Sequence, residues 1–408
     1  MKIGILTYHR ACNFGANLQA LSTCNYLRNH GYEPLFINWE TTLQERINKW
    51  KTPERELEEF SKFRNEHFPM TRLCRTDDDI VSVIKEYDIK AVIVGSDAVL
   101  QIHPFLSRIN FPCRKIITIS KPRLDVSCPN PFWGSFYAKL ERKLPFCLMS
   151  VSSQNSPYKS ALSKEKKMAR KMLGQFDYIS TRDDWTSKMV AYLTDGAKVP
   201  TVTPDPVFAF NLNVAAQPTK EDVMRRFKLP EKYALFCFHN NRTVSQKWLS
   251  EMQGKMELRG VECVALPFPE GIGFRHPFSK QVDLPLSPLD WYALIKYATY
   301  YIGGNMHPIV IALHNAVPCF SFDHYGIVRF RYFVNRESSK IYHILKSFGL
   351  AENMVSISGR GYREPSVEHV LGKLDSFDVE AVRAKGKNYL QRYQDMMKNI
   401  DELFLKSL

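Results

Sequence analysis

The feature that most constrains the fold of this chain is an alternation of short apolar runs with longer amphipathic segments. The apolar runs, such as "DIKAVIVGS" and "PFCLMSVSS", have the length and continuous hydrophobicity of strands that are buried on both faces. The segments between them have the length and spacing of helices. The alternation therefore predicts an α/β fold built on mainly parallel sheets, with helices on both faces of each sheet.

This alternation occurs twice along the chain. In the first part, strands are predicted at 2–8, 33–39, 88–96, 115–120, 145–153, 176–183 and 197–207, and helices at 17–30, 43–66, 77–86, 134–143, 163–174 and 184–193. In the second part, strands are predicted at 233–240, 261–268, 300–304 and 318–323, and helices at 244–257, 288–298 and 308–316.

A chain of 408 residues is too long for one ordinary core and fits two domains. The polar, proline-containing stretch from 211 to 222 reads as the linker between them. We therefore expect an N-terminal domain over 1–210, a C-terminal domain over 211–375 and a cleft between the two. The segment 376–408 is predicted to contain one long amphipathic helix, which either packs on the second domain or crosses back to the first.

The composition predicts a soluble, cytoplasmic protein. Hydrophobic residues make up 44% of the chain and the mean hydropathy is −0.29, and no apolar run reaches the roughly 20 residues that span a bilayer. Because the sequence begins directly with a predicted strand, we expect no signal peptide. The 9 cysteines are scattered and never form a C-x-x-C pair, which favours free buried thiols over disulfides or a metal site.

The charge balance indicates an anionic partner. Lysine and arginine number 56 against 42 acidic residues, a net charge of +14, which a membrane surface, a nucleic acid or a phosphorylated substrate would all satisfy. Nucleic acid is disfavoured because the basic residues are dispersed and no recognised binding module is visible. The segments 43–72 and 101–133 mix basic and aromatic side chains. They are either a solvent-exposed helix and an irregular loop, or a patch, including Trp133, that rests on the inner face of the plasma membrane.

The loop that follows the first predicted strand is unusually rich in hydrogen-bonding groups. It contains Asn13, Gly15 and Asn17 just before a predicted helix. Asn13 and Gly15 suit a turn, and Asn17 suits the N-cap of a helix that starts at Leu18. The same loop also lies where α/β proteins hold ligands, at the carboxyl end of a strand and the N-terminus of a helix. Both interpretations remain open from the loop alone.

Two further strand ends carry charged or polar residues. Ser96 and Asp97 follow the buried run 89–94, where Asp97 either caps the next helix or serves as a base or as an anchor for a sugar hydroxyl. Arg182 and Asp183 end another strand, and together they are either a surface ion pair or part of a site.

The second part of the chain contains two loops suited to an anion. His239, Asn240 and Arg242 lie between a strand and a helix, which is a favourable position for binding negative charge. Asn305 and His307 follow a Gly-Gly pair, and the proline after His307 favours the start of a helix there. We interpret His307 as a ligand contact at a positive helix end.

Several quoted loops together resemble the polysaccharide pyruvyl transferase family, although no standard phosphate-binding, dinucleotide, zinc-protease or serine-hydrolase motif is present. The resemblance covers about residues 1–330. It rests on "KIGILTYHRACNFGANLQAL", "VIVGSDAV", "SVSSQNS", "ISTRDDW", "PDPVF" and "MHPIVIALHNAVPCFSFDHYG" in that order.

This resemblance implies two Rossmann-like domains that face a cleft, as in GT-B glycosyltransferases. The implied reaction moves a pyruvyl group from phosphoenolpyruvate to two hydroxyls of a hexose, forming a ketal and releasing phosphate. The implied acceptor is a lipid-linked oligosaccharide precursor of a polysaccharide. No metal and no organic cofactor is expected, and nucleic acid is not an expected partner.

The resemblance also implies roles for the polar residues. His307 would bind phosphoenolpyruvate and act as the acid, with Asp97 as the base. The donor side would further include His239, Asn240, Arg242, Asn305 and Arg182, and the acceptor side would comprise Asn13, Gly15, Asn17, Ser96 and Asp97.

Two positions depart from the family pattern. The family often has arginine two residues before the histidine, where this chain has Asn305, a neutral amide that cannot form a charged bidentate pair. Either Arg242, Arg182 or Arg275 replaces that cation or donor binding is weak. The residues after Asp97 also lack the glutamine followed by isoleucine or tryptophan that is common in relatives. One alternative is a GT-B glycosyltransferase of the same fold that uses a nucleotide-sugar. A second alternative, which Asn305 keeps open, is a non-catalytic scaffold in polysaccharide assembly.

Overall fold

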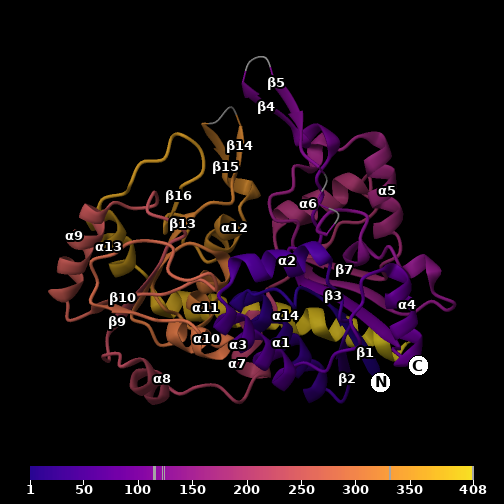
Figure 1. Ribbon diagram of the computed structural model, residues 1–408, viewed down its shortest axis with the longest axis horizontal. Coiled ribbons are helices and arrows are strands. Elements are labelled where there is room, and N and C mark those ends of the chain that lie inside the picture. The colour runs from indigo at the N-terminus through magenta and orange to yellow at the C-terminus, as the bar shows by residue number, and fades with distance from the viewer. Residues whose placement is uncertain (114–115, 122, 124, 330–331, 407–408) are drawn as a thin grey trace.

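The computed structural model describes residues 1–113, 116–121, 123, 125–329 and 332–406. Figure 1 shows two α/β units side by side, each built around one sheet. The first sheet has the order β2-β1-β3-β6-β7-β8 and the second the order β11-β10-β9-β12-β13-β16, and every strand pair in both is parallel. The predicted fold class is confirmed.

The strands of the first sheet are β2 (Glu33–Phe36), β1 (Lys2–Leu6), β3 (Ala91–Asp97), β6 (Phe146–Val151), β7 (Tyr178–Thr181) and β8 (Thr201–Val202). Those of the second sheet are β11 (Lys280–Gln281), β10 (Glu262–Ala265), β9 (Tyr233–Cys237), β12 (Tyr300–Gly303), β13 (Cys319–Asp323) and β16 (Met354–Ser356). Two antiparallel hairpins lie outside the sheets and consist of β4 (Ile109–Cys113) with β5 (Ile116–Ile119), and β14 (Ile327–Arg329) with β15 (Phe333–Asn335).

Helices follow most strands, as parallel pairing requires. In the first unit they are α1 (Phe14–Asn29), α2 (Thr42–Lys51), α3 (Glu54–His67), α4 (Asp77–Glu86), α5 (Ser163–Leu173) and α6 (Asp184–Leu193). The later helices are α7 (Phe210–Asn213), α8 (Lys220–Phe227), α9 (Gln246–Glu257), α10 (Pro288–Lys296), α11 (Met306–His314), α12 (Lys340–Ser347), α13 (Val367–Asp375) and α14 (Val379–Leu405). Short 3₁₀ turns are η1 (Phe105–Arg108), η2 (Pro131–Trp133), η3 (Tyr137–Lys139), η4 (Tyr158–Ser160), η5 (Pro206–Ala209) and η6 (Arg336–Ser338).

The units share part of their hydrophobic core. Phe14, at the start of α1, stacks between Phe60 of α3 and Trp291 of α10, with ring centroids 5.3 and 5.2 Å away. Offset aromatic stacking of this kind adds to the free energy of burial. Since Trp291 belongs to the second unit, this stack fixes the N-terminus of α1 against that unit.

Helix α14 also joins the two units. It follows the second sheet in the chain, and Figure 1 shows it, in yellow, running across both units. Tyr26 of α1 donates a hydrogen bond to Asp401 at 2.8 Å, and Asn213 donates one to Tyr393 at 3.1 Å. Among the described residues, no helix is long and apolar enough to cross a membrane.

Local structure differs from the sequence prediction at several places. The strand predicted at 197–207 is only β8, Thr201–Val202, and it is followed by the 3₁₀ turn η5, where Pro206 follows the N-cap Asp205. The first helix begins at Phe14 rather than near Leu18, because Asn13 rather than Asn17 is its N-cap. The helix predicted at 43–66 is two helices, because Pro53 cannot donate the hydrogen bond that would continue the first.

Two further differences lie in the segment 101–143. The strand predicted at 115–120 is the hairpin strand β5, not part of a sheet, and its first residue lies outside the described residues. The helix predicted at 134–143 is only the 3₁₀ turn η3, where Tyr137 stacks on Phe146 of the core at 4.7 Å.

The expectation that Trp133 faces a membrane is wrong. The indole is fully buried in the core of the first unit, and its Nε1 donates a hydrogen bond to the carbonyl of Gln101 at 3.1 Å. A buried indole with a satisfied N–H is a core residue.

Candidate functional site

A small cavity of about 90 Å³ lies where the two units meet. We call it the inner cavity, and the lining residues used below are Asn13, Gly15, Asp97, Asn305, His307, Tyr325 and Lys340. It lies at the carboxyl ends of strands in both sheets, because β3 ends at Asp97 and β12 ends just before Asn305. This is the edge at which α/β sheets hold ligands.

A larger hollow of about 370 Å³ shares Asn13, Asn305 and Tyr325 with the inner cavity, so the two adjoin. We call it the outer recess. Its other lining residues are Cys12, Gln154, Asn155, His239, Phe268, Pro269, Glu270 and His324. Among the residues that the structure describes, its wall therefore offers amides, imidazoles and an aromatic ring, with a single acidic residue and no lysine or arginine.

The N-terminus of α1 borders the inner cavity and is capped from within. Asn13 accepts a hydrogen bond from the backbone N–H of Ala16 at 3.0 Å through its side-chain oxygen. Asn17 lies one turn into the helix and donates to the carbonyls of Ala11 and Asn13, both at 2.9 Å. Asn17 is buried, and its hydrogen bonds fix the backbone of this loop, while Asn13 and Gly15 line the cavity.

The N-terminus of α11 faces the same cavity without a side-chain cap. Asn305 occupies the N-cap position with a φ of +71°, and its side chain makes no capping hydrogen bond. The Asn305 oxygen instead accepts from His239 Nε2 at 3.0 Å and from Tyr325 at 3.4 Å. The first amide groups of α11 therefore have no side-chain oxygen over them, and the positive end of the helix dipole points into the cavity.

His307 lies in the first turn of α11 and is pressed against Gly15 of the other unit. A Cβ placed on Gly15 would lie 2.1 Å from the His307 ring, far inside van der Waals contact. Only glycine at this position therefore lets the imidazole and the N-terminus of α1 approach so closely. The contact brings one predicted acceptor residue and one predicted donor residue into the same cavity.

A buried ion-pair network supports the floor of this site. Arg182 lies 2.6 Å from Asp205 and 3.4 Å from Asp97, and its side chain is 1% exposed. His307 Nε2 lies 3.6 Å from Asp205 and has no hydrogen-bond partner among the described residues. Arg182 is therefore held beneath the cavity by two carboxylates, and it orients Asp97 rather than lining the cavity.

The pKa values of His307 and Asp97 are both lowered. Burial lowers the pKa of His307 and outweighs the opposing effect of Asp205 and Asp97, so the imidazole is neutral near pH 7. Burial acts to raise the pKa of Asp97, but nearby positive charge, first from Arg182 and also from Lys340, outweighs it, so the pKa is lowered and the carboxylate stays charged. Asp97 also has a φ of +91°, a strained conformation of the kind found at functional sites.

Lys340 lines the inner cavity and was missed by the sequence analysis. It is the first residue of α12, and its Nζ lies 4.3 Å from the centre of the Tyr325 ring. The preceding residue, Ser339, caps α12 and donates a hydrogen bond to Asp323 at 2.6 Å, which fixes the backbone there. Burial, followed by repulsion from Arg182, lowers the pKa of Lys340 to about 8.

One sequence signal points to Lys340 in retrospect. A lysine directly after the cap serine sits in the first turn of a helix, where positive charge is unfavourable. Such a placement indicates that something other than helix stability keeps the lysine there. The sequence alone does not show that α12 points at the same cavity as α1 and α11.

The remaining predicted residues lie apart from the inner cavity. Ser96 is buried and donates to the carbonyl of Ser150 at 2.6 Å. Asn240 and Arg242 are exposed, line neither the inner cavity nor the outer recess, and pair locally through the Arg242 backbone N–H. His239 lines the outer recess and stacks on Phe268 at 4.1 Å. Arg275 is also exposed and lines neither hollow.

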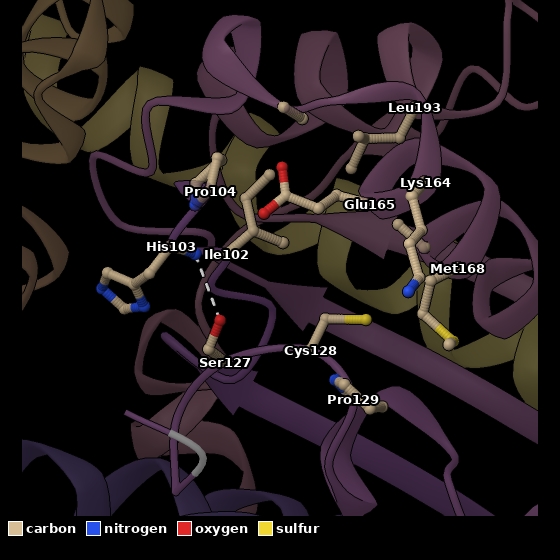
Figure 2. Close-up of a pocket in the computed structure, with 12 residues that line it drawn as sticks. Ile102, His103, Pro104, Ser127, Cys128, Pro129, Lys164, Glu165, Met168 and Leu193 are labelled. Carbon is tan, nitrogen blue, oxygen red and sulfur yellow. Dashed lines mark hydrogen bonds between the residues drawn. The ribbon is translucent and has the colours of Figure 1, made fainter. Parts of the chain in front are cut away.

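A third cavity, of about 210 Å³, lies within the first unit and has a different character. Figure 2 shows Cys128, Met168 and Leu193 around it, with the His103 ring directed away. Glu165 accepts hydrogen bonds from the backbone N–H groups of Phe105 and Leu162, so its carboxylate is already satisfied. Among the described residues, no three histidine, cysteine or acidic side chains are grouped so that they could hold a metal.

Comparison with known proteins agrees with this architecture. A family model described as polysaccharide pyruvyl transferase matches residues 13–325. No curated protein sequence matches the chain.

Three solved structures show the GT-B arrangement of the same two units. UDP-GlcNAc 2-epimerase from Neisseria meningitidis, bound to UDP-GlcNAc, is 10% identical with a TM-score of 0.55 over 100% of both chains. A UGT transferase from Siraitia grosvenorii in complex with UDP is 10% identical with a TM-score of 0.53 over 99% of both chains. The spinosyn forosaminyltransferase SpnP is 11% identical with a TM-score of 0.51 over 99% of both chains. At this identity the likeness establishes the fold alone.

Proposed function

The chain belongs to the polysaccharide pyruvyl transferase family, and on that premise we propose that it transfers pyruvate from phosphoenolpyruvate to a hexose as a cyclic ketal. The observation that carries the proposal is the inner cavity. There the N-termini of α1, α11 and α12 meet, with Lys340 and His307 beside them. The uncapped N-terminus of α11 and the Lys340 ammonium together favour a small anion.

The donor would occupy the inner cavity. Phosphoenolpyruvate carries a phosphate and a carboxylate, and the uncapped N-terminus of α11 and the Lys340 ammonium offer one positive centre for each. Lys340 thereby takes over the cationic role that the family pattern assigns to arginine at position 305. A cavity of about 90 Å³ suits a three-carbon ester better than a nucleotide, because pockets for larger ligands are typically about 300–1,000 Å³.

Proton transfers would involve His307 and Asp97. The imidazole is neutral in the empty site, and a dianion beside it raises its pKa, so that His307 takes up the proton it then gives to the methylene carbon of the donor. The resulting cationic centre is attacked by a sugar hydroxyl, whose proton Asp97 accepts. Phosphate then leaves and the neighbouring hydroxyl closes the ketal. One hydroxyl hydrogen ends on the new methyl group and the other on phosphate.

The acceptor would occupy the outer recess. Its amides, supplied by Asn13, Gln154 and Asn155, suit sugar hydroxyls, and the exposed His239 ring, stacked on Phe268, offers a flat face to a sugar ring. A wall with no lysine or arginine favours a neutral hexose over an acidic one. We propose that the hexose belongs to a lipid-linked polysaccharide precursor, because the chain belongs to a family that modifies polysaccharides.

The proposal needs neither a metal nor an organic cofactor, since the protons and the leaving phosphate complete the reaction. The test is to incubate the protein with phosphoenolpyruvate and candidate glycans in the presence of EDTA. We expect free phosphate and a glycan whose mass has increased by one pyruvate ketal. A His307→Ala variant should lose both signals while keeping its melting temperature within a few degrees.

Parallel reactions distinguish the alternatives. If a nucleotide-sugar raises the melting temperature or is consumed while phosphoenolpyruvate does neither, the protein is a glycosyltransferase. If neither compound binds but the glycan does, the protein is a scaffold. A fully active His307→Ala variant would contradict the site assignment while leaving the family unaffected.

A further inference from the structure

Two hairpins project from the same edge of the molecule, the upper edge in Figure 1. One is formed by β4 and β5 of the first unit, and the other by β14 and β15 of the second unit. Neither belongs to a sheet core. The second hairpin nonetheless touches the first unit, because Ile327 of β14 packs against that unit's hydrophobic core.

Both hairpins expose large apolar side chains to solvent. Ile117 and Ile119 of β5 are 65% and 54% exposed, and Tyr332 and Phe333 at the start of β15 are 58% and 70% exposed. A single exposed side chain of this kind is ordinary, but four on two projections from the same edge expose apolar area that water does not favour. We call Ile117, Ile119, Tyr332 and Phe333, with the basic residues named next, the hairpin surface.

The charge on the hairpin surface has one sign. Neither 109–121 nor 327–336 contains an aspartate or a glutamate. Lys121, Arg329 and Arg336 are exposed beside the apolar side chains. The acidic residue that follows the second hairpin, Glu337, lies 3.2 Å from Lys346 and is partly neutralised by it.

The hairpin surface is connected to the candidate site. The second hairpin lies in the chain between Tyr325 and Lys340, both of which line the inner cavity. Its base is fixed because Ser338 accepts a hydrogen bond from the N–H of Ile327 at 2.8 Å, and Asn155 of the first unit donates to the carbonyl of Tyr325 at 2.7 Å. The hairpin therefore projects from the rim of the cleft.

We infer that the hairpin surface rests on an anionic lipid bilayer. Aliphatic and aromatic side chains enter the boundary between headgroups and acyl chains, and lysine and arginine pair with lipid phosphates. Stable peripheral binding needs both contributions, the insertion of apolar side chains and the attraction of basic residues to lipid phosphates. The cleft would then open near the membrane, where a lipid-linked acceptor would present its sugar. Binding to the bilayer does not depend on the proposed reaction.

The experiment is co-sedimentation of the full-length protein with vesicles, without phosphoenolpyruvate. We expect binding to vesicles of phosphatidylcholine with phosphatidylglycerol, weak binding to phosphatidylcholine alone, and a loss of binding as salt is raised. The double variant Ile119→Ser with Phe333→Ser should bind about tenfold more weakly, and Arg329→Gln with Arg336→Gln should lower binding by more than tenfold, about fivefold for each charge.

Matched controls lie on helices of the second unit, away from both hairpins. Leu258→Ser removes a side chain that is 87% exposed at the end of α9, and Arg225→Gln removes a charge on α8. Both should bind vesicles like the unchanged protein. All variants should retain their melting temperature and any phosphate-releasing activity on a water-soluble acceptor.

Three outcomes would overturn the inference. One is equal binding of the hairpin variants and the controls to vesicles. Another is a dimer, detected by light scattering, that the apolar variants abolish while vesicle binding is absent, because the hairpin surface would then be a contact between two copies. The last is full competition by a soluble polyanion with no effect of the apolar variants, because only charge would then matter.

Discussion

The N-termini of α1 and α11 meet at the inner cavity but differ in how their backbone amides are satisfied. Asn13 caps α1 with its own side chain, whereas Asn305 directs its oxygen to His239 and Tyr325 and leaves α11 uncapped. The first arrangement stabilises a helix, and the second leaves a positive helix end for something else to neutralise. The contrast shows that α1 supplies shape to the site and α11 supplies charge.

The largest effect is expected from Gly15, where the two helices touch. Gly15→Ala places a methyl group within 2.1 Å of the His307 ring, so α1 and α11 must separate. We expect phosphoenolpyruvate-dependent phosphate release to fall about a hundredfold or more, and the free energy of unfolding to fall by about 1–3 kcal/mol.

The matched control is Gly254→Ala in α9, where an added Cβ meets nothing within 4 Å. That variant should keep its activity and gain about 0.5–1 kcal/mol of stability, because alanine favours a helix interior. Normal activity in Gly15→Ala would show that the close contact between the helices is not needed.

The next largest effect is expected from the cation that supplements α11. Lys340→Met keeps a long apolar side chain but removes the ammonium, and phosphoenolpyruvate affinity measured by calorimetry should fall about 10–100-fold. Lys346→Met on the exposed end of the same helix should bind phosphoenolpyruvate normally. Equal losses in both variants would indicate a general effect of charge rather than a donor contact.

The titration of Lys340 makes donor binding depend on pH. Its pKa is about 8 in the folded protein, so the ammonium is lost as the pH rises past 8 and phosphoenolpyruvate affinity should fall there. The unfolded lysine holds its proton up to a pH of about 10.4. Between these values the unfolded state binds more protons, so the free energy of unfolding of the empty protein should rise with pH. Lys340→Met should show neither change.

A tenfold effect is expected when α11 receives a cap of its own. Asn305→Asp places a carboxylate at the uncapped N-terminus, which stabilises the helix by up to about 1 kcal/mol but competes with the donor for the same amides. Phosphoenolpyruvate affinity should fall about tenfold while the melting temperature rises. Asn305→Gly suits the φ of +71° without adding charge, so it should weaken donor binding less than the aspartate does.

The smallest effect is expected at the capped helix. Asn13→Ala removes the hydrogen bond to Ala16 and should lower the free energy of unfolding by about 1 kcal/mol, measured by urea denaturation. Donor affinity should change by less than threefold, because α1 supplies shape and not charge. A loss as large as that of Lys340→Met would abolish the distinction between the two helices.

Much of the fold follows from the sequence because strand and helix patterns are local. The helices α4 and α6 have the predicted bounds, the buried strand β6 lies within its predicted run, and β3 extends one residue past its predicted run, to Asp97. Prediction failed where packing decided the outcome: Tyr137 stacks on the core and prevents a helix, and Trp133 is enclosed by the first unit.

The candidate site was predictable only in part. Asn13, Gly15, Asp97, Asn305 and His307 were identified from loops at strand ends, and the structure brings all five to one cavity. The same rule also selected residues that the structure places elsewhere. Asn240 and Arg242 are exposed and line neither hollow. Three others are buried, because a strand end has a buried side and an open side that sequence does not distinguish. These are Asn17, Ser96 and Arg182.

By itself, therefore, the sequence determined two parallel α/β units and the loops that end their strands, because hydrophobic spacing and turn-forming residues act over a few neighbours. Only the tertiary structure decided which helix ends meet and that Gly15 touches His307 across the two units. It also decided that Lys340 lines the same cavity as these two residues. Those contacts link residues hundreds of positions apart. They depend on how the units pack around the Phe14 stack, which no local pattern encodes.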